Sequence, residues 1–237
     1  MFKKIRVRKV SEEVVDQIKG AILEGRLKPG DKLPPERELI KDLGVSRVSL
    51  REALNSLESM GFVEIRQGGG SFVRSVVSDR IKDPLDLMIK ENVNKVFDLI
   101  EVRKAIETWA AYHAADRATE EDIETLTRIV ETMKRELDES KPSPKSDADF
   151  HLAISQASHN TIQAHLMFTI YALLEEYLRF LNEKTLSNLE VRDRLYQQHL
   201  RVFHAIKNRD GEAARREVME HLNFVEGELK KLLPLPG

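Results

Sequence analysis

The stretch LGVSRVSLREAL, residues 43–54, decides how the first third of this chain folds. Gly44 interrupts one helical pattern, and Ser46 is a good N-cap for a next helix that extends to about residue 60. Pro35 suits the first turn of the preceding helix. Two short helices separated by a tight turn predict a helix-turn-helix. Apolar side chains on both sides of the turn would hold it together, namely Leu39, Leu43, Val45, Leu50 and Leu54.

Two short strand-like runs follow this motif, Phe62–Arg66 and Ser71–Arg74, on either side of Gly68-Gly69-Gly70. Side chains in the first run alternate with period two, which is typical of a strand with one buried face. Glycine accepts the positive φ that a tight hairpin turn requires. A helix-turn-helix followed by a glycine-tipped hairpin predicts a winged helix-turn-helix.

Two arginines open the second helix of the motif, Arg47 and Arg51, and their spacing of four residues places them on one helix face. The major groove of DNA admits a helix, and arginine can donate two hydrogen bonds to guanine. The hydroxyl of Ser49 and the amides at the helix start suit phosphates, and Arg37 could reach the same backbone.

The tip of the hairpin could touch the minor groove or phosphates through Gln67, Gly68 and Gly69. For each of these residues there is a simpler alternative. The arginines could be ordinary solvated side chains, and the hairpin tip could be only a turn.

Beyond the hairpin the strand signals end and helical patterns continue. We expect helices at residues 84–91, 94–117, 120–140, 145–158, 160–187, 190–208 and 211–233. Thr119 to Asp122 resembles a capping box, with Asp in place of the usual Glu. The sequence thus predicts a mainly α protein with a winged helix-turn-helix DNA-binding domain at residues 1–75, a linker at 76–84, and an antiparallel all-α helical bundle at 85–237.

Composition narrows the function classes. The chain of 237 residues has no cysteine, which excludes disulfides, a thiolate nucleophile and a cysteine-ligated zinc finger. Its net charge of −2 combines a basic first 75 residues with an acidic remainder, and a basic domain suits a polyanion. No apolar run approaches the roughly 18 residues that span a bilayer. The basic start lacks the apolar region of a signal peptide, so we expect a cytoplasmic protein without a membrane partner.

Four potential metal ligands lie in the bundle region. Asp147 and His151 are four residues apart on one predicted helix, whereas His199 and His221 lie on apolar stripes of two later helices. Three inward histidines and an aspartate would suit Zn²⁺, Ni²⁺ or Mn²⁺. The alternative is that each is a buried histidine satisfied by hydrogen bonds. His204 is expected to face solvent.

One cation also lies on an apolar stripe. Arg103 shares its helix face with Leu99, Ile106 and Ala110. A planar guanidinium suits bidentate binding of a carboxylate. The alternative is a pair within the helix with Glu107.

The first domain resembles the DNA-binding domain of GntR-family bacterial transcription regulators, over residues 27–39, 43–54 and 57–63. The resemblance implies that Arg37, Arg47, Ser49 and Arg51 contact the operator and that the wing tip at Gln67-Gly68-Gly69 enters the minor groove. Val48 stands where many members have threonine, which removes any hydroxyl contact at that position.

The bundle region resembles the FCD effector domain of the FadR subfamily. The resemblance is carried by residues 147–154, 157–160, 205–206 and 219–222, together with His199. That resemblance implies a divalent metal ion, with zinc first and nickel or manganese next, held by Asp147, His151, His199 and His221. It also implies that Arg103 grips the carboxylate of a small acid effector such as lactate or pyruvate.

We therefore expect a homodimeric transcription regulator of palindromic double-stranded operators, because two recognition helices contact two half-sites. Two alternatives remain at this point. One is a metal-dependent hydrolase, although the sequence has no HExxH motif to supply a general base. The other is a regulator whose metal is purely structural.

Overall fold

The computed structural model describes residues 8–75, 79–139, 143–185 and 188–233. Over these residues the chain forms ten α-helices and one two-stranded antiparallel sheet, as the prediction of a mainly α protein requires. It divides into two compact units, Met1–Ser78 and Asp79–Gly237.

The first unit has its own apolar core. Its helix α1 buries Val14, Ile18 and Ile22, which recur at helical spacing, against Leu50 and Leu54 of the third helix. The elements of this unit, in chain order, are α1 (Val10–Leu23), α2 (Glu36–Leu43), α3 (Arg47–Ser59), β1 (Val63–Arg66) and β2 (Gly70–Val73).

The turn between α2 and α3 has the features that the sequence predicts. Gly44 adopts a left-handed conformation with a φ of 64°, and its N–H donates to the carbonyl of Ile40. Ser46 caps α3, because its hydroxyl accepts a hydrogen bond of 3.1 Å from the backbone N–H of Ser49. The prediction of a helix-turn-helix is confirmed.

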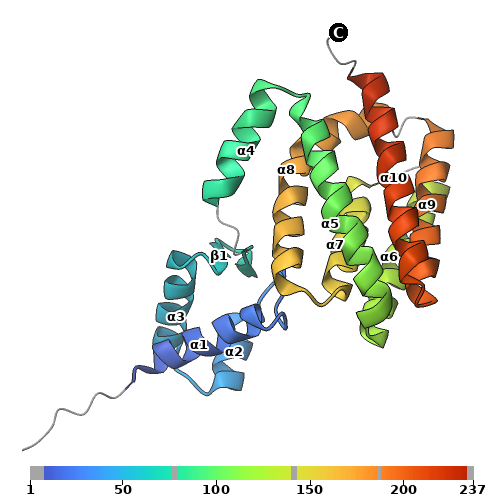
Figure 1. Cartoon of the computed structure of the whole chain (residues 1–237). Coiled ribbons are helices and arrows are strands. Elements are labelled where there is room, and N and C mark those ends of the chain that lie inside the picture. The colour runs from blue at the N-terminus through green and yellow to red at the C-terminus, as the bar shows by residue number, and fades with distance from the viewer. Residues whose placement is uncertain (1–7, 76–78, 140–142, 186–187, 234–237) are drawn as a thin grey trace, which may run out of the picture. The chain divides into compact units, whose positions relative to one another are not determined.

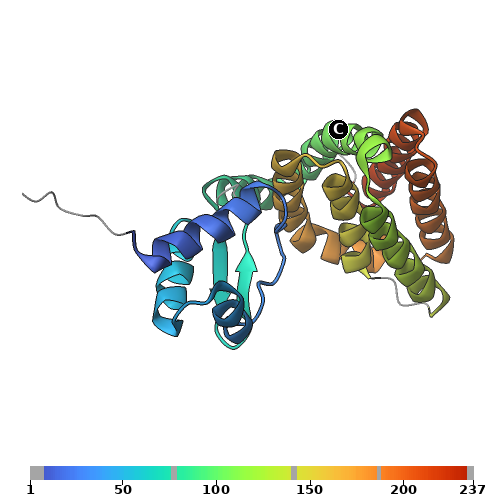
Figure 2. The same ribbon diagram turned by 90° about the horizontal axis from the view of Figure 1, so that it is seen from below.

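The wing is a hairpin of β1 and β2, in which Val63 pairs with Val73 and Arg66 pairs with Gly70 (Figure 2). Gly68 and Gly70 both have positive φ, 73° and 102°, so the tip needs residues without a Cβ. Val63 and Val73 face the core, which anchors the hairpin to the helices.

The second unit is a helical bundle (Figure 1). Helix α5 lies along α10 and also packs on α7 and α9. Four buried alanines of α5, residues 110, 111, 114 and 115, allow this close approach because their side chains are small. The helices of this unit are α4 (Asp79–Glu91), α5 (Lys95–Arg117), α6 (Glu120–Asp138), α7 (Pro144–Ala157), α8 (Thr161–Thr185), α9 (Leu189–Lys207) and α10 (Gly211–Leu232).

Most helix ends agree with the sequence within two residues, and the capping box of α6 forms between Thr119 and Asp122. The start of α4 does not agree. Residues 79–84 were expected in a linker that ends at Pro84, but the helix begins at Asp79 and continues through Pro84. Pro84 is the sixth residue of this helix, so it lacks an N–H where an i→i−4 hydrogen bond would normally form. A proline therefore disfavours a helix at that point but does not exclude helix on both of its sides. Residues 76–78 lie outside the described part of the chain.

Among the described helices, none combines the length and the apolar character that crossing a bilayer requires.

Candidate functional site

Helix α3 presents one face of its first two turns to solvent. Arg47 and Arg51 are exposed on one face, and Val48 between them is 76 % exposed. Ser49 is half-buried, and its hydroxyl lies 3.0 Å from the hydroxyl of the capping Ser46. The arginines are therefore available to a ligand, whereas the hydroxyl of Ser49 already has a partner.

A shallow hollow joins α3 to the wing. Its lining includes Arg51, Glu36 and the wing tip from Gln67 to Gly69. The Nε of Arg51 donates to a carboxylate oxygen of Glu36 at 3.2 Å. Because this ion pair is exposed, it is weak and a phosphate or base could replace the carboxylate. Arg37 is also exposed, on α2, but like Arg47 it does not line the hollow.

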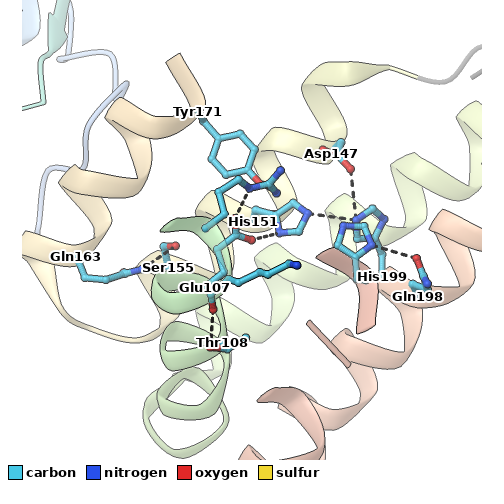
Figure 3. A network of polar contacts seen from close by, with 12 residues as sticks. Glu107, Thr108, Asp147, His151, Ser155, Gln163, Tyr171, Gln198 and His199 are labelled. Carbon is cyan, nitrogen blue, oxygen red and sulfur yellow. Dashed lines mark hydrogen bonds and ion pairs between the residues drawn. The ribbon is translucent and has the colours of Figure 1, made fainter. Parts of the chain in front are cut away.

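The structure brings four potential metal ligands together inside the bundle. Asp147 and His151 come from α7, His199 from α9 and His221 from α10, and one ligand atom from each lies within 4.8 Å of the others. Figure 3 shows His151 and His199 facing one another, with Asp147 beside His199. The three imidazoles are at most 3 % exposed.

Each ligand lies where its helix stripe places it. His199 follows Leu195 and precedes Val202 on the inner face of α9, and His221 takes the same place on α10 after Val218. Apolar rings enclose the group, since Phe150 lies 4.9 Å from His199 and Tyr171 stacks on His151 at 5.6 Å, both measured between ring centroids.

Two further side chains orient the imidazoles. The Nδ1 of His221 lies 3.2 Å from the side-chain oxygen of Gln198, which can only accept, so Nδ1 carries the proton and Nε2 is left as the ligand atom. The Nδ1 of His151 lies 2.6 Å from Oε2 of Glu107. These two atoms are not aligned as a regular hydrogen bond, but neither has another partner among the described residues.

Two of the histidines, His199 and His221, are held in the neutral form that metal coordination needs. Burial lowers the pKa of His199 to about 4. Burial, aided by the imidazoles of His199 and His151, lowers the pKa of His221 well below its usual value. Nε2 of His199 and Nε2 of His151 are 3.3 Å apart, and Nε2 of His199 is 3.3 Å from Oδ1 of Asp147. A cation between these atoms would satisfy all of them.

Arg103 lies beside this group, fully buried. Its Nε donates to Oε1 of Glu107 at 2.5 Å, and a terminal nitrogen donates to the hydroxyl of Tyr171. Burial alone would raise the pKa of Glu107, but the charges of Arg103 and His151 outweigh it and hold that pKa at about 2. The pair within the helix, the alternative interpretation of Arg103, is thus present in the structure.

A small cavity opens onto the ligand group. It measures about 100 Å³ and is lined by polar residues, including Arg103, Asp147, Arg192, His199 and His221, and by apolar residues of α9 and α10. This volume exceeds the roughly 10–15 Å³ that a cavity needs to hold one water molecule. The cavity therefore suits a small ligand.

Sequence reasoning did not find the roles of four residues around the site. Glu107 lies beside His151, Gln198 lies beside His221, and Tyr171 accepts a hydrogen bond from Arg103. Arg192 lines the cavity. A signal existed for Arg192, because it precedes His199 by seven residues and so shares its helix face. Tyr171 had none, since only packing brings α8 beside α5. His204 is exposed, as expected.

Comparison with known proteins agrees with both units. Residues 10–73 match bacterial regulatory proteins of the gntR family, and residues 98–224 match the FCD domain. The transcriptional regulator LutR of Bacillus subtilis strain 168 is 36 % identical over 209 residues, covering 86 % of this chain and 94 % of LutR. A protein of Escherichia coli strain K12 named for regulation of an L-lactate dehydrogenase operon is 37 % identical over 228 residues, covering 94 % of this chain and 88 % of that protein.

A solved structure of Streptococcus agalactiae GntR superimposes with a TM-score of 0.55 at 26 % identity, covering 92 % of this chain and 99 % of that one. The structure of E. coli McbR/YncC, at 21 % identity and a TM-score of 0.52 over 95 % of this chain and 99 % of its own, shares the fold. The relatives are transcription regulators rather than enzymes. The chain therefore belongs to the FadR-like subfamily of the GntR family and is a DNA-binding transcription regulator with a winged helix-turn-helix and an FCD domain.

Proposed function

We propose that this regulator binds palindromic double-stranded operators as a homodimer and that a small carboxylate, bound at a metal centre in the FCD domain, controls its affinity for them. The observation that carries the proposal is the convergence of Asp147, His151, His199 and His221 beside a small cavity in a unit separate from the DNA-binding one.

On the DNA side, Arg47 and Arg51 read base edges in the major groove, since both project from the exposed start of α3. Ser49 and Arg37 contact the phosphate backbone. The wing tip, Gln67, Gly68 and Gly69, contacts the minor groove. The exposure of these residues supports the assignment, except for Ser49 and Gly69, which are half-buried.

On the effector side, the donor set fits a divalent ion. Four nitrogen and oxygen ligands with no sulfur suit zinc first, and nickel or manganese next. Ligand atoms about 2.0–2.1 Å from a tetrahedral zinc ion are about 3.3 Å apart, and two of the separations in this site are 3.3 Å. Because four protein side chains would fill a tetrahedral ion, an oxygen of the acid could bind only at a fifth position, which zinc reaches by expanding its coordination.

The effector class follows from the cavity. Its size suits a small organic acid, and lactate or pyruvate is a reasonable first choice because one relative is named for an L-lactate dehydrogenase operon. Arg103 lines the same cavity and adds positive charge to it, although Glu107 neutralises much of that charge. An acid that binds the two conformations of the regulator differently, by about 1–3 kcal/mol, would change operator affinity.

Native mass spectrometry of the purified protein tests the subunit count, the metal and any retained acid in one measurement. Operator binding is then measured by fluorescence anisotropy with and without L-lactate and pyruvate, for metal-loaded and metal-stripped protein. We expect a dimer with one ion per subunit and an acid response that metal removal abolishes. If stripping the metal unfolds the bundle and no acid changes operator affinity, the metal is purely structural.

A further inference from the structure

The cavity beside the ligand group contains a positive charge that the protein leaves without a counter-ion. Arg192 on α9 is 9 % exposed and lines the cavity. Its Nε is buried without a hydrogen-bond partner, and no ion pair joins its side chain to a carboxylate within the described part of the chain. Burying a charged group without a partner is unfavourable, so this arrangement needs an explanation.

The position of Arg192 is set by α9. It precedes His199 by seven residues, two helical turns, and Leu195 and Tyr196 between them line the same cavity. The cavity wall therefore has the imidazoles and Asp147 in one part and the guanidinium of Arg192 in another.

The carboxylates that line the cavity have other partners. Glu136 accepts a hydrogen bond of 2.5 Å from the hydroxyl of Ser146, and Glu228 pairs with Lys231 at 2.7 Å. Asp147 lies against His199. None of these three is paired with Arg192.

Arg103, the other arginine of the cavity, differs in this respect. Its Nε is bound to Glu107 at 2.5 Å and its terminal nitrogen to Tyr171, so its charge is compensated before any ligand arrives. An anion that enters the cavity gains more from a cation without a counter-ion than from one already paired.

We propose that Arg192 binds a carboxylate of the effector. The inference rests on the proposed function, because it assumes that an organic acid occupies this cavity. It adds that the acid has a carboxylate for Arg192 and a second oxygen donor toward the ligand group, as in a small hydroxy or keto acid.

The test uses the full chain loaded with metal, and isothermal titration with L-lactate, pyruvate and the neutral amide lactamide. The variants are Arg192→Gln and Arg192→Met, and Arg194→Gln is the matched control. Arg194 lies on the same helix but is exposed and stacks over Phe224, so its substitution makes the same charge change outside the cavity.

We expect both Arg192 variants to bind L-lactate or pyruvate about 10- to 100-fold more weakly than the wild type, because one charge-assisted contact is lost. Lactamide, which has no charge to lose, should bind the wild type and the variants equally. The metal content should stay that of the wild type, since Arg192 is not a ligand. Unchanged affinity for the acids in both variants would overturn the inference.

A second readout separates this inference from the proposed function. If the wild type binds neither acid, the proposed function fails for these acids, and the stability of the ligand-free protein then decides the role of Arg192. A denaturation midpoint of Arg192→Met equal to or above that of the wild type supports an uncompensated charge held for an anion. A lower midpoint, with Arg194→Gln unchanged, would show that Arg192 is structural and would overturn it.

Discussion

Replacement of Glu107 by glutamine tests the central ion pair of the bundle. The side chains of Arg103 and Glu107 are 2 % and 3 % exposed and their charged atoms are 2.5 Å apart. Coulomb's law at an effective dielectric constant of about 20 gives an attraction of about 7 kcal/mol at that distance, which desolvation of both groups offsets in part. Because Glu107→Gln keeps the shape but leaves a buried cation alone, we expect it to lower the free energy of unfolding by about 3–5 kcal/mol.

The single tryptophan of the chain, Trp109, lies on the same helix as this pair, so its fluorescence reports unfolding of the bundle rather than of the DNA-binding unit. Urea and thermal unfolding of metal-free protein are the assays, and the expected fall in Tm is about 6–20 °C. The control is Asp138→Asn, which breaks the exposed pair of Lys134 and Asp138 and should leave the free energy of unfolding close to that of the wild type.

Two further measurements sharpen this prediction. Glu107 lies beside Nδ1 of His151, so Glu107→Gln should also weaken metal binding about 10- to 100-fold. The double variant Arg103→Met, Glu107→Leu removes both charges and should be more stable than Glu107→Gln alone. If Glu107→Gln unfolds like the wild type and keeps its metal affinity, the reasoning about a compensated buried charge is refuted.

Three other outcomes are expected. Arg47→Ala and Arg51→Ala should each reduce discrimination between operator and random DNA by about 1–3 kcal/mol in anisotropy titrations; equal discrimination would contradict base reading by these arginines. His199→Ala should lose metal in native mass spectrometry but keep operator binding in the absence of effector; normal occupancy would exclude it as a ligand. The lowered pKa values of His199 and His221 mean that the unfolded chain binds more protons than the metal-free folded protein between pH 6.5 and about 4. The free energy of unfolding should therefore be highest above pH 6.5 and should fall as the pH drops toward 4, by about 3 kcal/mol for His199 alone. A urea midpoint that stays constant over this range would contradict the burial of neutral imidazoles.

The fold of the DNA-binding unit could be predicted because its signals are local. Each signal depends only on the residue's own backbone conformation or on the next turn of the chain. In the structure Gly44 and the wing glycines Gly68 and Gly70 have positive φ, and Ser46 caps α3. Helix starts with a capping box or an N-terminal proline, such as Thr119 and Pro144, were located within a residue for the same reason. The start of α4 was not, since residues 79–83 contain neither a capping box nor a proline.

The bundle site could be predicted only in part. Helical stripes show that His151, His199 and His221 face inward, but not that three different helices bring them to one point; the FCD resemblance supplied that step. Arg103 had two interpretations, and the structure shows the pair with Glu107 while leaving Arg103 in the cavity wall. Arg192 was missed because a charged residue on a helix is usually solvated, even when it lies seven residues before a buried histidine. Only the packed structure shows that its Nε is buried.

The origin of the ligand group in α7, α9 and α10 has a consequence for how long the protein survives. This chain has no cysteine and cannot form a covalent crosslink between these helices, but an ion bound to all four residues would be a reversible one. The stabilisation that such an ion would give grows with the concentration of available metal, to about 4 kcal/mol at a thousand times Kd. In a metal-starved cell the bundle would open more often, so proteases would remove the regulator fastest when its ion is scarce.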